Sequence, residues 1–413
     1  MDQLSRLSAE VSELIYSNPF YKSRLHPIRD WDDFYSLPFT TKSELVEDQL
    51  AHPPFGTNLT YPLDRYIRLH QTSGTSGGRP LRWLDTAESW EWWCGIWKDH
   101  VYKAAGVSEE DRVFLAFSFG PFIGFWSAFG GAERLGAMVI SGGAMTTEQR
   151  IQAILDLEPT VLCCTPTYAL RLAETARRMG YDLSSSSIKT TIHAGEPGAS
   201  IPATKRAIEE AFGASCFDHT GMTELGPTGH SCTAGGGVHL IDSEFILEVI
   251  PEGSPPNPSS TKPEGRGELV ATNLGRLGSP LIRYRTGDLV ELSYAPCPCG
   301  SSFPKVVGGI QGRVDDMFTV RGVNLYPSQV EEVLRRYPAI AEFQIRHRKV
   351  RHMDEVSLLI ETEEDGDLFL EQINAELRHA FGVRIDCECV PLGTLPRHEM
   401  KARRVVHEMI NES

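Results

Sequence analysis

The sequence predicts an α/β protein with two domains. A large N-terminal domain, residues 1–312, is expected to hold parallel sheets sandwiched by helices, together with a small β subdomain. Residues 313–413 are expected to form a small, mobile C-terminal α+β domain. Three observations support this organisation: strand-like runs alternate with helical segments between residues 112 and 218, strands follow without helices over residues 267–290, and a mixed order begins after residue 312.

The composition is that of an ordinary globular protein. The 413 residues include 41% hydrophobic and 23% charged residues, and two domains are expected at this length. The formal net charge of −15 argues against a surface that coats nucleic acid and gives no support for a role at a membrane surface. The sequence has no apolar run of roughly 18 residues and no pattern of a secretion signal. The nine cysteines therefore predict reduced thiols or metal ligands, and a cytoplasmic protein.

The first 50 residues are expected to form a helical cover without chemistry of its own. Residues 8–15 place apolar side chains at the i, i+3, i+4 spacing of an amphipathic helix. Residues 37–45 predict a loop that leads into a capped helix, with Thr41 or Lys42 at its start.

The stretch from His70 to Pro80 is a candidate ligand-binding loop. It follows a strand-like run, residues 65–69, and combines three glycines with hydroxyl side chains and Arg79. Glycines allow successive backbone N–H groups to point at one place, which suits a polyphosphate when a cation lies nearby. The G-x-x-x-x-G-K-[ST] pattern does not occur in the sequence, and a plain turn explains the same composition.

Aromatic residues dominate two predicted helices. The helix over residues 89–97 fits packing against a sheet. A second apolar helix, residues 122–129, begins where the strand-like run 112–119 ends. The aromatic side chains of this region would either wall a flat pocket or belong to the core. They are Phe119, Phe122, Phe125 and Trp126.

Strands and helices continue to alternate as far as residue 218. Strands are predicted over residues 135–140, 160–164 and 188–193, and helices over residues 147–157, 168–179 and 202–212. Their short connections predict parallel strands that are covered on both faces. Cys163 and Cys164 lie within a predicted strand and are expected to be small core residues.

Two of these strands end in segments with polar side chains. The turn Ala194-Gly195-Glu196-Pro197 follows one strand, and residues 215–224 predict a strand followed by a loop that carries Asp218 and Glu224. Ligands bind at the carboxyl ends of strands in open α/β sheets. An acidic loop residue is usually solvated, but Glu224, after a turn of glycine and hydroxyl residues, is a candidate metal ligand.

The remaining segments complete the two domains. Five prolines within residues 251–265 predict a surface loop, and residues 267–272 and 281–290 predict strands. The domain boundary is placed at residues 312–316. In the small domain, helices are predicted over residues 328–336 and 368–381, and strands over residues 342–346, 356–361 and 386–390.

Cysteines and histidines on both sides of the predicted β subdomain suggest a zinc site. Cys297-Pro298-Cys299 brings two thiols into one turn, and Cys232 with either His230 or His239 would complete a tetrahedral set. Such an ion would close the subdomain and stabilise it, without a part in catalysis. Four unconnected residues explain the same spacing.

Five segments together resemble the motifs of one family. In order they are Gln71–Pro80, Ala194–Pro197, Asp218–Glu224, Tyr284–Asp288 and Gly312–Met317, with Lys401 near the end. They are similar to the motifs of the acyl-adenylate-forming (ANL) superfamily, and Val320–Gln329 is similar to the signature of its phenylacetate–CoA ligase-like branch. Two positions depart from the family pattern: Thr220 stands where an aromatic residue is usual, and Met400 where a glycine is usual before the lysine.

The resemblance implies a site for ATP. Glu224 would hold Mg²⁺, Lys401 would bridge the carboxylate and the α-phosphate, and Thr223 would join them as a catalytic residue. Arg79 would provide a positive charge near the phosphates. The implied ATP- and AMP-binding residues are Ser73, Gly74, Thr75, Gly77, Ala194, Gly195, Glu196, Pro197, Asp218, His219, Thr220, Asp288 and Arg313.

The resemblance also implies the other regions of the site. Asp315 would be the hinge, and Arg321 and Gly322 would contact CoA. The implied acyl pocket consists of Phe119, Phe122, Phe125, Trp126, Ala194, Gly195 and Gly221. Some members carry zinc at positions that match Cys232, His239, Cys297 and Cys299, which favours His239 over His230.

The expected activity is ATP-dependent activation of an aromatic carboxylic acid to an acyl-AMP, followed by transfer to CoA. ATP, Mg²⁺ and CoA are the expected cofactors, with a structural Zn²⁺. The expected partner is a small aromatic acid, and dimers are common in this branch. The alternative is an acyl-adenylate former that passes the acyl group to an amine, a hydroxyl or a carrier-protein thiol. A non-catalytic nucleotide-binding protein is disfavoured because Glu224, Asp288 and Lys401 are all present.

Overall fold

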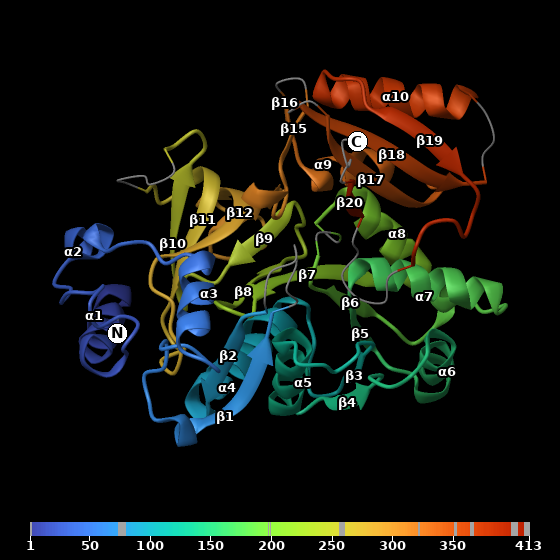
Figure 1. Cartoon of the computed structure of the whole chain (residues 1–413). Coiled ribbons are helices and arrows are strands. Elements are labelled where there is room, and N and C mark those ends of the chain that lie inside the picture. The colour runs from blue at the N-terminus through green and yellow to red at the C-terminus, as the bar shows by residue number, and fades with distance from the viewer. Residues whose placement is uncertain are drawn as a thin grey trace.

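A large body and a smaller C-terminal domain make up the molecule (Figure 1). The computed structural model describes residues 2–72, 80–196, 198, 200–255, 261–320, 323–350, 353–363, 367–397 and 404–408. The large body contains a 12-stranded sheet, and the small domain contains a four-stranded sheet. This mixed α/β architecture confirms the predicted fold class. Within the described part of the chain, no helix is long and apolar enough to span a membrane.

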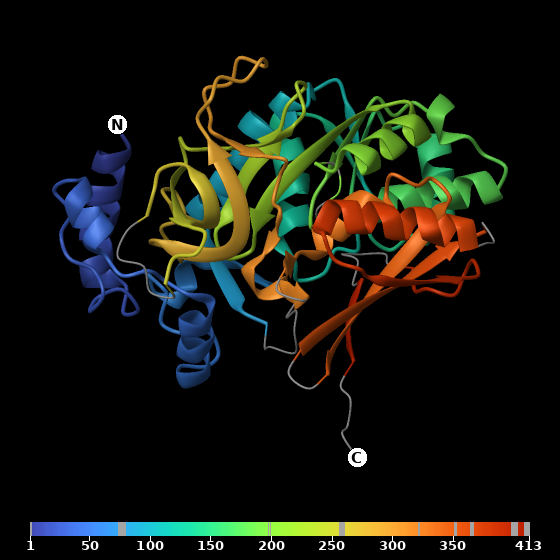
Figure 2. The same ribbon diagram turned by 90° about the horizontal axis from the view of Figure 1, so that it is seen from above.

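Three N-terminal helices lie at the end of the body away from the small domain (Figure 2). They are α1 (Gln3–Ser17), α2 (Trp31–Ser36) and α3 (Lys42–Ala51). The apolar face of α1 packs with Ile246 and Ile282 of the large body, as the amphipathic spacing predicts. Thr41 is the N-cap of α3 and forms a capping box with Glu44, so the helix begins where the sequence predicts.

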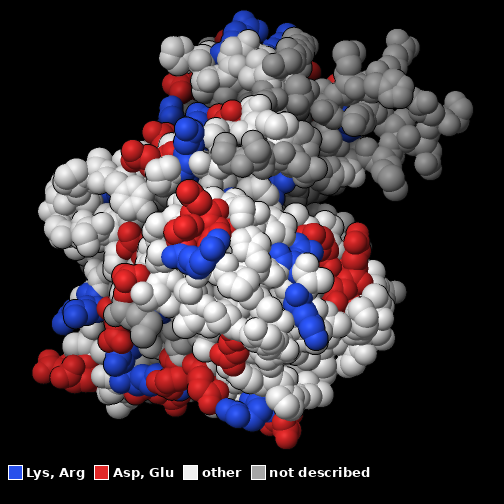
Figure 3. All heavy atoms as spheres, turned by 90° about the vertical axis from the view of Figure 1, so that its left-hand side faces the viewer, with Lys and Arg blue, Asp and Glu red and all other residues white. Residues whose placement is uncertain are grey.

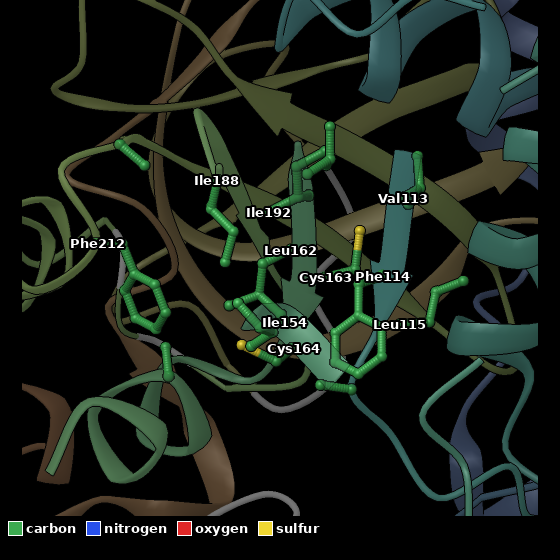
Figure 4. Close-up of a cluster of buried hydrophobic side chains, with 14 of the residues drawn as sticks. Val113, Phe114, Leu115, Ile154, Leu162, Cys163, Cys164, Ile188, Ile192 and Phe212 are labelled. Carbon is green, nitrogen blue, oxygen red and sulfur yellow. The ribbon is translucent and has the colours of Figure 1, made fainter. Parts of the chain in front are cut away.

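Five parallel strands form one part of the large sheet, in the order β4-β3-β5-β6-β7. Their bounds are β3 (Arg112–Leu115), β4 (Met138–Ser141), β5 (Val161–Cys164), β6 (Thr190–His193) and β7 (Ser215–Met222). The connecting helices are α5 (Ile123–Leu135), α6 (Thr147–Leu157), α7 (Pro166–Arg178) and α8 (Pro202–Phe212). Side chains of these strands and helices form the core shown in Figure 4, which includes Phe114, Leu162 and the two cysteines predicted to be core residues.

Three boundaries in this region differ from the predicted ones. The strand predicted over residues 112–119 ends at Leu115. Leu135 belongs to α5, because Gly136 ends that helix in the left-handed conformation with a φ of 89°, and β4 begins only at Met138. The strand that contains Asp218 continues to Met222, so the predicted loop is shorter than expected.

The predicted β subdomain is continuous with the parallel strands through β7. This strand pairs in parallel with β6 and antiparallel with β8, and the order then continues β9, β13, β12, β11, β10, with β14 paired to β12. The antiparallel strands are β8 (Gly226–Ser231), β9 (Gly237–Leu240), β10 (Phe245–Pro251), β11 (Gly265–Asn273), β12 (Tyr284–Ser293), β13 (Lys305–Val307) and β14 (Gly312–Arg313). A single mixed sheet therefore replaces separate sheets.

A hairpin and an aromatic helix complete the large body. The hairpin consists of β1 (Tyr66–Gln71) and β2 (Arg82–Thr86), and α4 (Ala87–Ile96) continues into a π-helical turn, Trp97–Tyr102. Trp93 and Cys94 of α4 are buried, which confirms that this helix packs as core.

The small domain contains a sheet of order β19-β18-β17-β20. The elements of the small domain are β15 (Phe318–Val320), β16 (Val323–Leu325), α9 (Pro327–Leu334), β17 (Ile340–Val350), β18 (Met353–Thr362), α10 (Asp367–Phe381), β19 (Asp386–Val390) and β20 (Val405–Glu408). Helix α10 covers the side of this sheet that faces away from the large body (Figure 1). Strand β20 was not predicted, because four residues give too little periodicity.

Charged side chains on the surface are mixed in sign. On the face seen in Figure 3, basic and acidic side chains lie next to one another. This pattern and the net charge of −15 give no support to a nucleic-acid partner.

His193 at the end of β6 is a buried histidine in the parallel part of the sheet. Its side chain is fully buried, Nδ1–H donates to the carbonyl of Cys164 at 3.1 Å, and Nε2 lies 2.9 Å from the hydroxyl of Thr191. Burial disfavours the charged imidazole and lowers the pKa of His193 from 6.5 to about 4. The unfolded chain therefore binds a proton that the folded chain excludes between these two pH values.

We expect the free energy of unfolding to fall as the pH is lowered from about 6.5 toward 4, with up to about 3 kcal/mol due to His193. His193→Gln should be less stable at pH 7.5 but should lose less stability over this range. Urea unfolding at several pH values measures this. The control His379→Gln, which removes an exposed histidine, should keep the steeper dependence; an equal slope in His193→Gln would contradict the assignment.

Candidate active site

The carboxyl ends of β5, β6 and β7 meet at one edge of the large sheet. In register, Cys164 lies beside His193, and His193 lies beside Asp218. The segments that follow these strands are therefore neighbours, as the predicted parallel order requires. Asp218 accepts a hydrogen bond from the hydroxyl of Ser200, and its backbone N–H donates to Ser231 at 2.8 Å.

Part of the predicted site lies outside the described residues. These residues are Ser73, Gly74, Thr75, Gly77, Arg79, Pro197, Arg321, Gly322 and Lys401, together with the side chain of Asp315. The base of the glycine-rich loop is described. Thr72 and Leu81 close it with two hydrogen bonds of 2.9 and 3.0 Å, and the N–H of Gln71 donates to the carbonyl of Pro121. The loop therefore begins beside the segment that leads into α5.

Glu224 lies two residues after the end of β7 and is buried. Its Oε1 lies 3.2 Å from Nζ of Lys42, the first residue of α3. The side chain of Lys42 is 45% exposed and that of Glu224 is 6% exposed, so the ammonium group reaches from the surface to a buried carboxylate. Sequence analysis placed Lys42 at a helix start and predicted no partner for it, because Glu224 is distant in the sequence.

A buried ion pair holds the backbone of this segment. Arg276 and Asp85 are both fully buried, and the guanidinium donates to the carboxylate at 2.7 and 2.8 Å. The third nitrogen of Arg276 donates to the carbonyls of Thr223 and Glu224 at 2.6 and 3.0 Å. Burial alone would raise the pKa of Asp85, but the Arg276 guanidinium holds it below its ordinary value. Because Asp85 belongs to β2, the pair links the hairpin of the glycine-rich loop to Glu224.

Asp288 on β12 lies opposite Arg313 on β14. Their side chains form an ion pair of 3.1 Å, and the two residues are also partners in the strand register. A Cβ at Gly287, which has a φ of 73°, would lie 2.8 Å from the guanidinium of Arg313. Two residues predicted to bind the ribose or phosphate are thus brought together at the domain boundary.

The residues between Asp218 and Glu224 lie on β7. The ring of His219 is buried, its Nδ1–H donates to the carbonyl of Gly229 at 2.9 Å, and its centroid is 4.3 Å from that of Trp97. Burial lowers the pKa of His219 to about 3, so the imidazole is neutral at physiological pH. Thr220 is half-buried and Gly221 is exposed. His219 therefore packs into the body, whereas Gly221 is exposed but closely faced by β8, since a Cβ there would lie 2.8 Å from the carbonyl oxygen of Gly226.

The predicted acyl-pocket aromatics gather around the start of α5. Phe119 packs edge-to-face against Trp126 with centroids 4.8 Å apart, and Nε1 of Trp126 donates to the carbonyl of Gly120 at 3.0 Å. Phe125 stacks on Phe117. Each of the four predicted residues is half-buried, a state intermediate between core and surface. The four are Phe119, Phe122, Phe125 and Trp126.

Three thiols and one imidazole converge between β8–β9 and the β12–β13 connection. The ligand atoms of Cys232, His239, Cys297 and Cys299 all lie within 4.8 Å of one another. Nδ1–H of His239 donates to the carbonyl of Phe303 at 2.8 Å, which leaves Nε2 facing Cys299 at 3.5 Å. His230, the other candidate of the sequence, is not a member of this cluster. The donor set suits a tetrahedral zinc ion.

A contact between the domains was also not predicted. Arg404, next to β20, donates to the hydroxyl of Thr167 on α7 at 3.1 Å. The backbone N–H of Thr167 in turn donates to the carboxylate of Glu196 at 3.0 Å. The available signal in the sequence was weak: an arginine three residues after Lys401.

Known proteins are similar to this chain along nearly its whole length. Residues 322–409 match the family model of the AMP-binding enzyme C-terminal domain. A phenylacetate–coenzyme A ligase of Thermus thermophilus is 32% identical over 438 residues, which cover 98% of this chain and 95% of the relative. The phenylacetate–coenzyme A ligase of Escherichia coli is 32% identical over 409 residues, which cover 95% of this chain and 89% of the relative.

A solved enzyme with the same architecture has been seen in more than one state. The 2-hydroxyisobutyryl-CoA ligase in its postadenylation state, in complex with R3-HIB-AMP, matches with a TM-score of 0.91 and 30% identity over 98% of this chain and 88% of that chain. The same ligase in its thioesterification state, with 2-HIB-AMP and CoA, gives a TM-score of 0.72 at 31% identity over the same shares.

We expect Asp85→Ala to lower the free energy of unfolding by about 3–5 kcal/mol, because it leaves the charge of Arg276 buried without its partner. Glu91→Ala breaks the more exposed pair with Arg134 and should cost under about 1 kcal/mol. Asp85→Ala/Arg276→Met should regain part of the loss. Urea unfolding tests this order, and equal losses in the two single variants would contradict it.

Proposed function

Because the chain belongs to the phenylacetate–coenzyme A ligase branch of the acyl-adenylate-forming enzymes, we propose that it activates an aromatic carboxylic acid with ATP and transfers the acyl group to CoA. In the first half-reaction, a carboxylate oxygen attacks the α-phosphorus of ATP and pyrophosphate leaves. In the second, the thiolate of CoA attacks the acyl carbon and AMP leaves. The similarity to phenylacetate–coenzyme A ligases over almost the full chain carries this proposal.

The edge formed by β5, β6 and β7 would hold the acyl-AMP. The turn at Ala194 and Gly195 would border the adenine and the acyl group, and Asp288 would bind the ribose hydroxyls. Arg313, which is ion-paired with Asp288, would contact the ribose or a phosphate. The glycine-rich loop would hold the outer phosphates, with its base fixed by Thr72.

The negative charge of the transition state would be met by residues from both domains. Lys401 would bridge the carboxylate and the α-phosphate, and Glu224 would hold Mg²⁺, for which a buried carboxylate oxygen is a suitable ligand. When bound, Mg²⁺ neutralises charge on the phosphates. The ammonium group of Lys42 already faces Glu224, so a positive and a negative side chain lie together in this part of the site.

The aromatic side chains at the start of α5 support an aromatic acid as substrate. Phe119 and Trp126 pack edge-to-face, and such rings offer flat apolar surface to a planar acyl group. Because the 2-hydroxyisobutyryl-CoA ligase also matches in structure, a branched aliphatic hydroxy acid is the informative competitor in any substrate panel.

The small domain would change position between the half-reactions, with residues 313–413 turning about Asp315. Arg321 and Gly322 would then contact CoA. The two TM-scores support this proposal, since the present arrangement matches the postadenylation state of the related ligase better than its thioesterification state. We infer that the described arrangement belongs to the adenylate-forming half of the cycle.

We further propose a structural zinc ion at Cys232, His239, Cys297 and Cys299. The cluster joins the β8–β9 turn to the long β12–β13 connection, which has few backbone hydrogen bonds of its own. An ion there would stabilise the antiparallel part of the sheet.

We expect carboxylate-dependent ATP–pyrophosphate exchange with an aromatic acid, tested against benzoic, hydroxybenzoic, aminobenzoic, arylacetic and 2-hydroxyisobutyric acids. Lys401→Ala and Glu224→Gln should each lower the exchange rate by about 10²–10³-fold, because each removes a stabiliser of the transition-state charge. The control Lys103→Ala changes an exposed lysine and should keep full activity.

If exchange is faster with 2-hydroxyisobutyric acid than with every aromatic acid, the proposed aromatic substrate is wrong, whereas the proposed reaction, formation of an acyl-AMP, still holds. An unchanged rate in Lys401→Ala would overturn the role of that lysine. Product analysis with CoA, and with an amine in its place, distinguishes the two acceptors.

We expect the purified protein to contain about one equivalent of zinc by elemental analysis. Cys232→Ser should lose the ion and unfold at a lower temperature, whereas Cys389→Ser, which changes a thiol of β19, should retain it. A metal-free protein with all nine cysteines reduced and unchanged thermal stability after chelation would refute the zinc site.

A further inference from the structure

We propose that Arg404 is a positioning residue for adenylate formation: through Thr167 it holds the start of β20, three positions after Lys401, against the large domain. This inference rests on the proposed function, since it concerns the placement of Lys401. It adds a contact and a role that the five recognised motifs do not contain.

Arg404 is anchored firmly within the small domain. Its Nε donates to Glu342 at 2.8 Å and one Nη donates to Glu331 at 2.9 Å, and the side chain is largely buried. The guanidinium also lies over the ring of Phe343, 4.9 Å from its centroid. Because these partners all belong to the small domain, the guanidinium moves with that domain as a fixed group.

One nitrogen of this guanidinium, Nη2, bonds Glu342 at 3.4 Å and also reaches the large domain. Nη2 of Arg404 donates to Oγ1 of Thr167 at 3.1 Å, at the start of α7. The backbone N–H of Thr167 donates to the Glu196 carboxylate at 3.0 Å. One residue therefore joins the small domain to the turn that would border the adenine and the acyl group.

Arg404 lies close to Lys401 in the chain, so the contact with Thr167 affects where Lys401 can lie. Arg404 follows Lys401 by three positions, and three extended residues span at most roughly 10 Å. A fixed Arg404 therefore restricts the space that Lys401 can reach. The contact with Thr167 fixes that space relative to the strand ends of the large body.

The contact favours one arrangement of the domains over the other. It exists in the described arrangement, whose TM-score is 0.91 against the postadenylation state and 0.72 against the thioesterification state of the related ligase. A bond made in one arrangement and absent from another shifts the population toward the first. The contact would therefore increase the rate of adenylate formation and would not increase the rate of thioester formation.

Thr167→Val tests this with little disturbance, since it removes the hydroxyl but keeps the backbone N–H to Glu196 and the charge pairs of Arg404. We expect carboxylate-dependent pyrophosphate exchange to fall about tenfold, which corresponds to ~1.4 kcal/mol. Thioester formation from supplied acyl-AMP and CoA should remain within twofold of the original rate or rise. Thr175→Val is the matched control, because it removes a threonine–arginine bond within α7 itself and should change neither rate.

Small-angle X-ray scattering of the full chain supplies a readout that does not depend on activity. Thr167→Val should populate more extended domain arrangements than the unsubstituted protein, and Thr175→Val should not. If the unsubstituted protein activates no acid, the proposed function fails, and scattering still decides whether the contact holds the domains. Equal losses in both half-reactions, or unchanged scattering together with unchanged exchange, would overturn the positioning role.

Arg404→Lys provides a second variant. A lysine keeps a positive charge beside Glu331 and Glu342 but cannot reproduce the planar fork that reaches three acceptors. We expect the same selective loss of pyrophosphate exchange as in Thr167→Val. An exchange rate equal to that of the unsubstituted protein would show that the cross-domain bond does not position Lys401.

Discussion

Strand β7 joins the parallel part of the large sheet to the antiparallel part. One of its edges pairs in parallel with β6, and the other pairs antiparallel with β8. The direction of the chain therefore changes at this strand, and its carboxyl end meets those of β5 and β6. The polar residues from Asp218 to Glu224 lie at this change, where open α/β sheets bind their ligands. The rest of the site is arranged around it.

Buried or half-buried ion pairs connect the segments that surround this strand. Asp85–Arg276 links the hairpin of the glycine-rich loop to Glu224, and Asp288–Arg313 links β12 to the domain boundary. Lys42 approaches Glu224 from the N-terminal helices. Each pair joins residues that are distant in sequence. Asp85–Arg276 is the fully buried pair of the three, and removing either of its partners would leave an uncompensated charge.

Sequence reasoning predicted the fold class, because the alternation of strands and helices is a local pattern. Its errors were also local: Gly136 ends α5 later than the apolar run suggested, and β20 is too short to show a period. The roles of Lys42, Thr167 and Arg276 could not be predicted, because each depends on a partner that only folding brings near. The cluster of Cys232, His239, Cys297 and Cys299 was predicted in part: the residue types suggested a metal site, while the choice between His230 and His239 needed either a family pattern or the geometry.

Arg276 recognises the segment after β7 by its carbonyl groups and not by its side chains. These two hydrogen bonds can therefore form with any side chains at positions 223 and 224. Gly275 next to the arginine has no such freedom, because a Cβ there would lie 2.2 Å from Nε1 of Trp92. Divergence within a gene family, or directed evolution in the laboratory, can thus exchange the reactive groups at this corner while the scaffold that presents them stays the same.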